Sequence, residues 1–132
     1  MYRFYNPNPS GIFTDDCIVR AACKVLDISW EAAYMGICLK GLDLHNMPDK
    51  NIVWDKYFLE NGMKMYAVTN HCPQCYTVMD FCRDHPVGKF IIGTGSHAVA
   101  IVNGDYYDTW YIVQNPNCCP QNYYNGCGRR MA

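Results

Sequence analysis

The chain has 132 residues, half of them hydrophobic and only 17% charged, with a formal net charge of -1. This length and composition predict one folded domain over residues 1–132 and exclude a disordered chain. The balanced charge argues against a nucleic-acid interface or a polybasic membrane surface, and no apolar run approaches the roughly 20 residues of a membrane span. Because residues 1–10 also lack the apolar segment of a signal peptide, we expect a cytoplasmic protein.

The first predicted elements are an irregular lead-in and a helix. Residues 1–14 are rich in Asn, Pro, Gly and Tyr, which are typical of irregular structure. A helix is expected to begin near Asp15 or Asp16, with apolar residues at helical spacing along one face. Arg20 and Lys24 fall on the opposite face, and for Arg20 a solvated helix face and a contact with substrate are equally good interpretations.

Three further helices are predicted from their end signals. Ser29 suits the N-cap of a second helix that ends at Gly41. Pro48 suits the first turn of a third helix, and Gly62 suits the C′ position after it. A capping box beginning at Thr77 predicts the start of a fourth helix.

The periodicity then changes from helix to strand. Residues 89–93, 97–102 and 105–112 are rich in β-branched and aromatic side chains, and Asn103-Gly104 is a strong signal for a two-residue hairpin turn. Helices followed by antiparallel strands predict an α+β domain. Residues 114–132 form a Cys-rich tail to which the sequence assigns no structure.

Three residues supply the groups that thiol-dependent acyl transfer requires: a nucleophile, a base and a group that orients the base. Cys17 lies at a predicted helix start, where the helix dipole favours a thiolate. The neighbouring Asp15 and Asp16 oppose the thiolate, so a nearby imidazolium of His97 would have to outweigh them. Asp108 is the predicted orienting group.

The predicted hairpin register connects these residues. A two-residue turn pairs Val102 with Asp105, so that paired residue numbers sum to 207. His97 and Asp108 then lie diagonally on one face, within reach of each other's side chains. A three-residue turn would move Asp108 to the opposite face.

Other residues are candidates for binding substrate. The backbone N–H of Cys17 is expected to contribute to an oxyanion hole, and Asn8 or Thr14 could supply the second donor. Tyr106 and Trp110 share the predicted face of His97 and are candidates for lining a substrate cleft.

Four segments together resemble a known group of proteins. They are Asn6-Pro7-Asn8-Pro9, Thr14-Asp15-Asp16-Cys17-Ile18-Val19-Arg20-Ala21, Ser96-His97-Ala98-Val99-Ala100-Ile101-Val102-Asn103-Gly104 and Tyr107-Asp108-Thr109-Trp110. Over residues 5–112 the chain resembles small papain-like, cysteine-peptidase-like proteins of bacteria and phages. It is more distantly similar to the peptidases that process double-glycine leader peptides.

The resemblance implies a papain-like cysteine proteinase fold with N-terminal helices packed on a C-terminal antiparallel sheet. It implies that Cys17 is the nucleophile, His97 the base and Asp108 the orienting residue. The expected function is hydrolysis of a peptide or protein substrate by a peptidase or amidase, without a cofactor. The chain departs from many relatives at Asp15, where they have Gly, and at Tyr111, where they have Asp.

Two other interpretations stay open. The nine cysteines are an odd number without an export signal, which favours reduced thiols over a disulfide framework. Cys72 and Cys75 nevertheless have the spacing of half a zinc site. The alternative to an enzyme is therefore a non-catalytic binding module on the same fold, stabilised by zinc in one version. Deamidation and acyl transfer to an amine would use the same triad, and the oligomeric state is left open.

Overall fold

The computed structural model describes residues 1–67, 76–93, 97–109 and 122–125. In chain order the elements are β1 (Tyr2–Phe4), α1 (Cys17–Leu26), α2 (Trp30–Asp43), α3 (Asn51–Glu60), β2 (Lys64–Ala67), α4 (Val78–Asp84), β3 (Lys89–Gly93), β4 (Ala98–Val102), β5 (Asp105–Asp108) and β6 (Asn122–Asn125). The domain is therefore a mixed α+β structure, as the sequence predicts.

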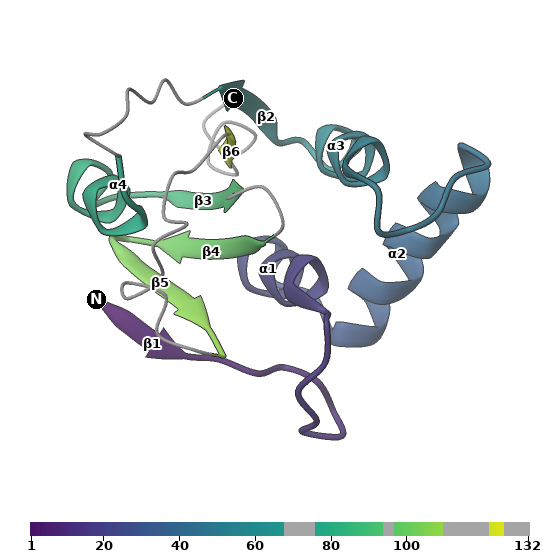
Figure 1. Ribbon diagram of the computed structural model, residues 1–132, viewed down its shortest axis with the longest axis horizontal. Coiled ribbons are helices and arrows are strands. Elements are labelled where there is room, and N and C mark those ends of the chain that lie inside the picture. The colour runs from purple at the N-terminus through teal and green to yellow at the C-terminus, as the bar shows by residue number, and fades with distance from the viewer. Residues whose placement is uncertain (68–75, 94–96, 110–121, 126–132) are drawn as a thin grey trace.

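The described strands form one sheet with the order β1-β5-β4-β3-β6-β2 (Figure 1). Strand β1 runs parallel to β5, and all the other neighbouring strands pair antiparallel. The sheet joins the first residues of the chain to its C-terminal part.

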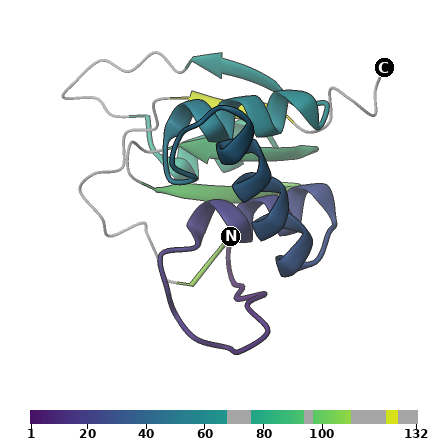
Figure 2. The same cartoon turned by 90° about the vertical axis from the view of Figure 1, so that its right-hand side faces the viewer.

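Helices cover both faces of the sheet because the central strands are apolar on both sides. Ile91, Ala98 and Ala100 belong to a buried cluster with side chains of α1, α2 and α3. The alternate positions Val99 and Ile101 belong to a second cluster with α4. Figure 2 shows α2 and α3 in front of the strands, on the side of the first cluster.

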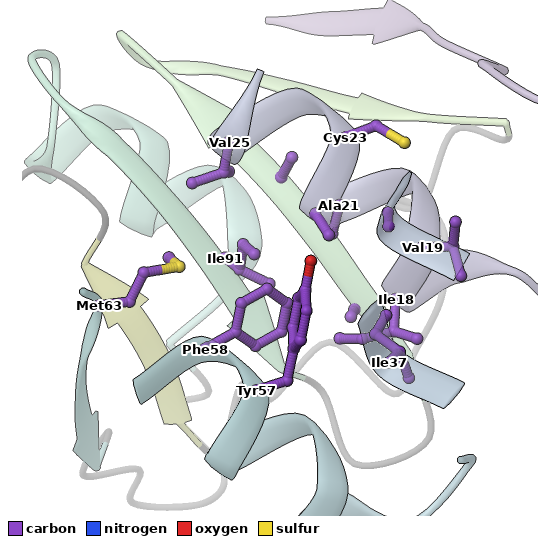
Figure 3. Close-up of a cluster of buried hydrophobic side chains, with 14 of the residues drawn as sticks. Ile18, Val19, Ala21, Cys23, Val25, Ile37, Tyr57, Phe58, Met63 and Ile91 are labelled. Carbon is purple, nitrogen blue, oxygen red and sulfur yellow. The ribbon is translucent and has the colours of Figure 1, made fainter. Parts of the chain in front are cut away.

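Helix α1 lies at the centre of the first cluster, between β4 and α2. Its alanines, Ala21 and Ala22, and the alanines of β4 are buried, and small side chains allow a helix to approach a strand closely. On the other side of this cluster, Tyr57 and Phe58 point from α3 toward α1 and β3 (Figure 3). Burial around α1 fixes the position of its N-terminus, where Cys17 lies.

Most of the predicted helix signals act as expected. The Ser29 hydroxyl accepts a hydrogen bond from the N–H of Ala32 at 3.1 Å, and Thr77 begins a complete capping box at α4. Gly62 follows α3 with a φ of 86°, as its predicted C′ position requires. Helix α2 continues past Gly41 to Asp43, and α3 begins at Asn51 rather than at Pro48, so two of the expected boundaries are wrong by two or three residues.

Three strands form where the sequence predicts irregular structure or no strand. The lead-in contributes β1, whose residues pair with β5 from Tyr2 to Phe4. The Cys-rich tail contributes β6, which pairs with β3 and with the unpredicted strand β2. All three strands are at most four residues long, too short for a period-2 pattern to be recognised. The expected strand over 105–112 ends at Asp108, and residues 110–112 lie outside the described ranges.

In the ranges that the structure describes, none of the helices combines the length and hydropathy needed to cross a membrane.

Candidate active site

Cys17 is the first residue of α1, and its side chain is half-buried. Asp16 occupies the N-cap position without a capping hydrogen bond from its side chain. Because the first N–H groups of a helix have no intrahelical acceptor, the Cys17 amide can donate to a bound group. The nucleophile candidate is therefore at the positive end of a buried helix.

The hairpin that carries His97 and Asp108 has the predicted register. Ala100 pairs with Tyr107 and Val102 with Asp105, so paired numbers sum to 207. The turn is formed by Asn103 and Gly104 with φ values of 50° and 83°, as a two-residue primed turn requires. His97 lies one residue before β4, and Asp108 is the last residue of β5.

The register brings the two side chains into contact. His97 Nε2 lies 2.6 Å from Asp108 Oδ2, and the side chains are 14% and 1% exposed. Interaction with the Cys17 side chain is one of the causes that raise the pKa of the His97 ring. The predicted triad residues are therefore brought together from α1, β4 and β5.

Electrostatics favour the protonated form of His97. Burial lowers its pKa, but hydrogen bonds with Asp108 and Cys17 and the charges of both groups outweigh burial and raise the pKa to about 9. An imidazolium at neutral pH can donate one proton to each of the two neighbouring acceptors. This arrangement matches what an activated thiolate requires from its base.

Arg20 is buried in the site rather than exposed on a solvated helix face. Its side chain is 5% exposed, and it forms an i,i+4 ion pair with Asp16. Its Nη2 also lies 3.1 Å from Asp108 Oδ1. The interpretation as a solvated face is wrong because α2 and β5 pack around α1. The i,i+4 spacing of Asp16 and Arg20 is a sequence signal for their ion pair. The contact of Arg20 with Asp108 has no such signal, because the two residues are 88 positions apart.

Asp16 opposes the Cys17 thiolate less than the sequence suggests. Its carboxylate pairs with Arg20 and accepts a hydrogen bond from Trp30 Nε1 at 2.9 Å. The charge beside the nucleophile is thus compensated inside the protein. Asp15, by contrast, is exposed.

Lys24, one turn after Arg20, packs against the sheet. It is half-buried, and its Nζ lies 4.2 Å from the ring centre of Tyr107, within the range of a cation–π interaction.

Asn8 is nearly buried and lies at the cavity beside Cys17. The residue is 8% exposed, and its Oδ1 accepts a hydrogen bond from the N–H of Ser10 at 2.9 Å. Within the described part of the chain, its Nδ2 group has no hydrogen-bond partner, and Asn8 lines the same cavity as Cys17. Thr14 lines this cavity too, and its carbonyl accepts from the N–H of Asp16. Both predicted donor candidates therefore lie at the cavity beside the thiol.

The cavity beside Cys17 has a volume of about 380 Å³. Its walls come from the lead-in, α1, α2, α3 and the segment before α3, and consist of Asn8, Ile12, Thr14, Asp15, Asp16, Cys17, Ile18, Val19, Trp30, Tyr34, Ile37, Cys38, Pro48, Asp49 and Trp54. Most of these side chains are apolar, so the cavity can enclose an apolar group next to the thiol.

The substrate-cleft prediction for Tyr106 is wrong. Tyr106 is fully buried in the cluster beneath α4, and its ring packs on Tyr2 with a centroid distance of 5.4 Å. It occupies the same side of β5 as Asp108, but the core covers it. Trp110 lies outside the described residues.

The proposed half zinc site at Cys72 and Cys75 also lies outside the described residues. Among the residues that the structure describes, no group of three or more His, Cys, Asp or Glu side chains is arranged to hold a metal ion.

Comparison of the chain with models of protein families, with curated proteins and with solved structures gives no match.

Proposed function

We propose that the protein is a cysteine hydrolase, a peptidase or amidase, that acts through Cys17, His97 and Asp108. The observation that carries this proposal is the position of His97. Its ring bonds to a buried carboxylate through Nε2, and interaction with Asp108 and with the Cys17 side chain raises its pKa to about 9. A base oriented by an acid and paired with a thiol is the arrangement that nucleophilic acyl transfer needs.

In the first half of the proposed reaction, the Cys17 thiolate attacks the carbonyl carbon of an amide and forms a C–S bond. The carbonyl electron pair moves to oxygen, and the resulting oxyanion accepts hydrogen bonds from the Cys17 N–H and from Asn8 Nδ2. The imidazolium of His97 then protonates the leaving nitrogen. The C–N bond breaks, the amine departs, and the acyl group stays on Cys17 as a thioester.

In the second half, His97 is neutral and takes a proton from a water molecule that attacks the thioester. The C–S bond breaks, the carboxylic acid leaves, and sulfur departs as the thiolate beside the imidazolium formed in this step, which restores the starting pair. Asp108 keeps the ring in one orientation through both halves and stabilises its positive charge.

We also propose that the fold is papain-like. A buried helix with the thiol at its N-terminus packs on an antiparallel hairpin that carries the base and the acid, in the chain order of the resembling proteins. The resemblance of the segments around Cys17 and His97 supports this proposal.

A peptide-mixture assay tests the proposed activity. The protein is incubated with a diverse peptide mixture, and new termini are identified by mass spectrometry, with acid quenching to capture an acyl-enzyme. We expect new termini and a mass increase on Cys17, both absent in Cys17→Ser. Ammonia release without backbone cleavage would identify an amidase acting on side chains. If no acyl-enzyme or product forms and Cys17 has ordinary reactivity, the binding-module alternative replaces the hydrolase.

A further inference from the structure

We propose that the substrate is a peptide that places a bulky apolar side chain in the cavity beside Cys17 and an adjacent Lys or Arg against Asp15 and Asp49. This inference rests on the proposed function, because it assigns the substrate class of the same site.

The walls of the cavity are mostly apolar. The indole N–H of Trp30 donates to Asp16 at 2.9 Å, and that of Trp54 donates to the carbonyl of Pro48 at 2.7 Å. Tyr34 stacks on Trp30 with ring centres 5.0 Å apart. Since both indole donors are already engaged, the rings can offer their faces to a ligand. A volume of about 380 Å³ is ample for one large side chain.

The border of the cavity is negatively charged. Asp15 and Asp49 are both exposed and line it, and neither forms an ion pair or hydrogen bond with another described residue. The third acid, Asp16, is compensated by Arg20. No lysine or arginine is among the described residues that line the cavity. A cationic group next to the apolar side chain would therefore meet two uncompensated carboxylates.

The Asn8 amide adds a hydrogen-bond donor to the lining of the cavity, which suits a peptide better than a hydrocarbon. Asn8 is only 8% exposed and lines the cavity. Its Nδ2 has no hydrogen-bond partner among the described residues. In the proposed mechanism this donor receives the carbonyl that Cys17 attacks. The apolar cavity, the amide donor and the nucleophile thus serve neighbouring parts of one peptide.

Peptidyl chloromethyl ketones test this assignment, because the Cys17 thiolate displaces chloride and the covalent product is counted by mass spectrometry. The probes are N-acetylated dipeptides that end in the ketone. They contain Phe and Lys, Phe and Glu, or Ala and Lys, and each pair is made in both residue orders. One further probe carries Phe and a free α-amine, which separates an α-ammonium from a side-chain cation. Each labelling rate is divided by the iodoacetamide rate of the same variant, so that changes in thiol reactivity cancel.

We expect the wild type to label about 10-fold faster with Phe-Lys than with Phe-Glu probes, since the two carboxylates attract the lysine and repel the glutamate. The ratio should fall below about 3-fold in the Asp15→Asn/Asp49→Asn double variant. It should not change in Asp43→Asn, which removes a carboxylate that does not line the cavity. The charge assignment is overturned if the wild type labels equally fast with Phe-Lys and Phe-Glu probes. It is also overturned if the double variant keeps the same Phe-Lys to Phe-Glu rate ratio as the wild type.

The apolar half has its own test. Cys38 is half-buried and lines the cavity, so Cys38→Leu should narrow it and reduce the preference for Phe over Ala probes several-fold. If that variant does not fold, Tyr34→Ala, at a side chain that is 47% exposed, should reduce the same preference by removing a stacked wall. Equal Phe and Ala rates in the wild type contradict the apolar assignment. Slow iodoacetamide labelling of Cys17 contradicts the proposed hydrolase itself, so the two failures are distinguishable.

Discussion

Arg20 of α1 and Asp108 of β5 form a buried ion pair, with Nη2 and Oδ1 3.1 Å apart. Because Arg20 also pairs with Asp16, one guanidinium joins the N-terminus of the nucleophile's helix to the strand that carries the acid. Asp108 thus has Arg20 and the N–H of Thr109 on one oxygen and His97 on the other. The ion pair sets the distance between helix and hairpin at the site.

Removing the Arg20 side chain is expected to destabilise the fold strongly. Arg20→Met removes the guanidinium from two buried carboxylates, so that Asp16 keeps only its hydrogen bond from Trp30 and Asp108 keeps only His97 and the N–H of Thr109. Breaking one side of a buried pair costs about 3–5 kcal/mol. Arg20→Lys should recover only part of this loss, because an ammonium cannot form the same fork of hydrogen bonds. Urea unfolding measures the change in the free energy of unfolding.

The matched control is Arg83→Met. Arg83 is 70% exposed and pairs with Asp80 on α4, so its loss should cost less than about 1 kcal/mol. Equal losses for the two arginine variants would contradict the structural role of Arg20.

The stability of the fold should depend on pH through His97. Its pKa is about 9 in the folded protein, above the ordinary value of 6.5. Protonated His97 therefore stabilises the fold fully below pH 6.5, by ~3 kcal/mol at 1.36 kcal/mol per pKa unit. This contribution is lost as the pH rises from 6.5 through 9.

Urea unfolding of the wild type and of His97→Gln between pH 6 and pH 10 measures this contribution. The difference between their free energies of unfolding should be constant below pH 6.5 and shrink above it. A difference that is independent of pH would show that His97 is not held as an imidazolium.

Asn8 should act on the rate of the chemical step. Asn8→Ser keeps an acceptor for the N–H of Ser10 but removes the amide donor, and the loss of one oxyanion donor lowers kcat by about 100-fold or more. The Michaelis constant and the rate of Cys17 alkylation should change little. Steady-state kinetics on a cleaved peptide provide the measurement. If Thr14→Val lowers kcat by a comparable factor and Asn8→Ser has only a small effect on kcat, the oxyanion donor is Thr14 instead.

The buried cysteines should be inert in the folded protein. Burial raises the pKa of both the Cys23 and the Cys82 thiols to about 11, and each side chain is 3% exposed. Iodoacetamide should therefore modify them only after unfolding. Site-resolved alkylation with and without urea tests this expectation, and rapid native labelling of either residue would contradict the packing around it.

Local signals predicted much of the structure. The serine N-cap, the threonine capping box and the Asn103-Gly104 turn act through contacts within a few residues, and each forms as predicted. Since the turn fixes the register, the approach of His97 to Asp108 also followed from the sequence.

The remaining features depend on long-range packing. Strands β1, β2 and β6 are short and exist through pairing with distant partners, which no local pattern reveals. Helical periodicity left a solvated face open for Arg20 because periodicity cannot show that α1 is covered on several sides. Tyr106 shares its side of the strand with Asp108, and only the packing of α4 determines that it belongs to the core.

The central claim is that His97 activates the Cys17 thiol, and site-resolved iodoacetamide labelling as a function of pH tests it most directly. Cys38 is a half-buried internal reference in the same chain. The account predicts that Cys17 labels rapidly well below pH 8 in the wild type, and that His97→Ala slows this labelling toward the rate of Cys38. Labelling of Cys17 no faster than that of free cysteine, and unchanged in His97→Ala, would contradict the account.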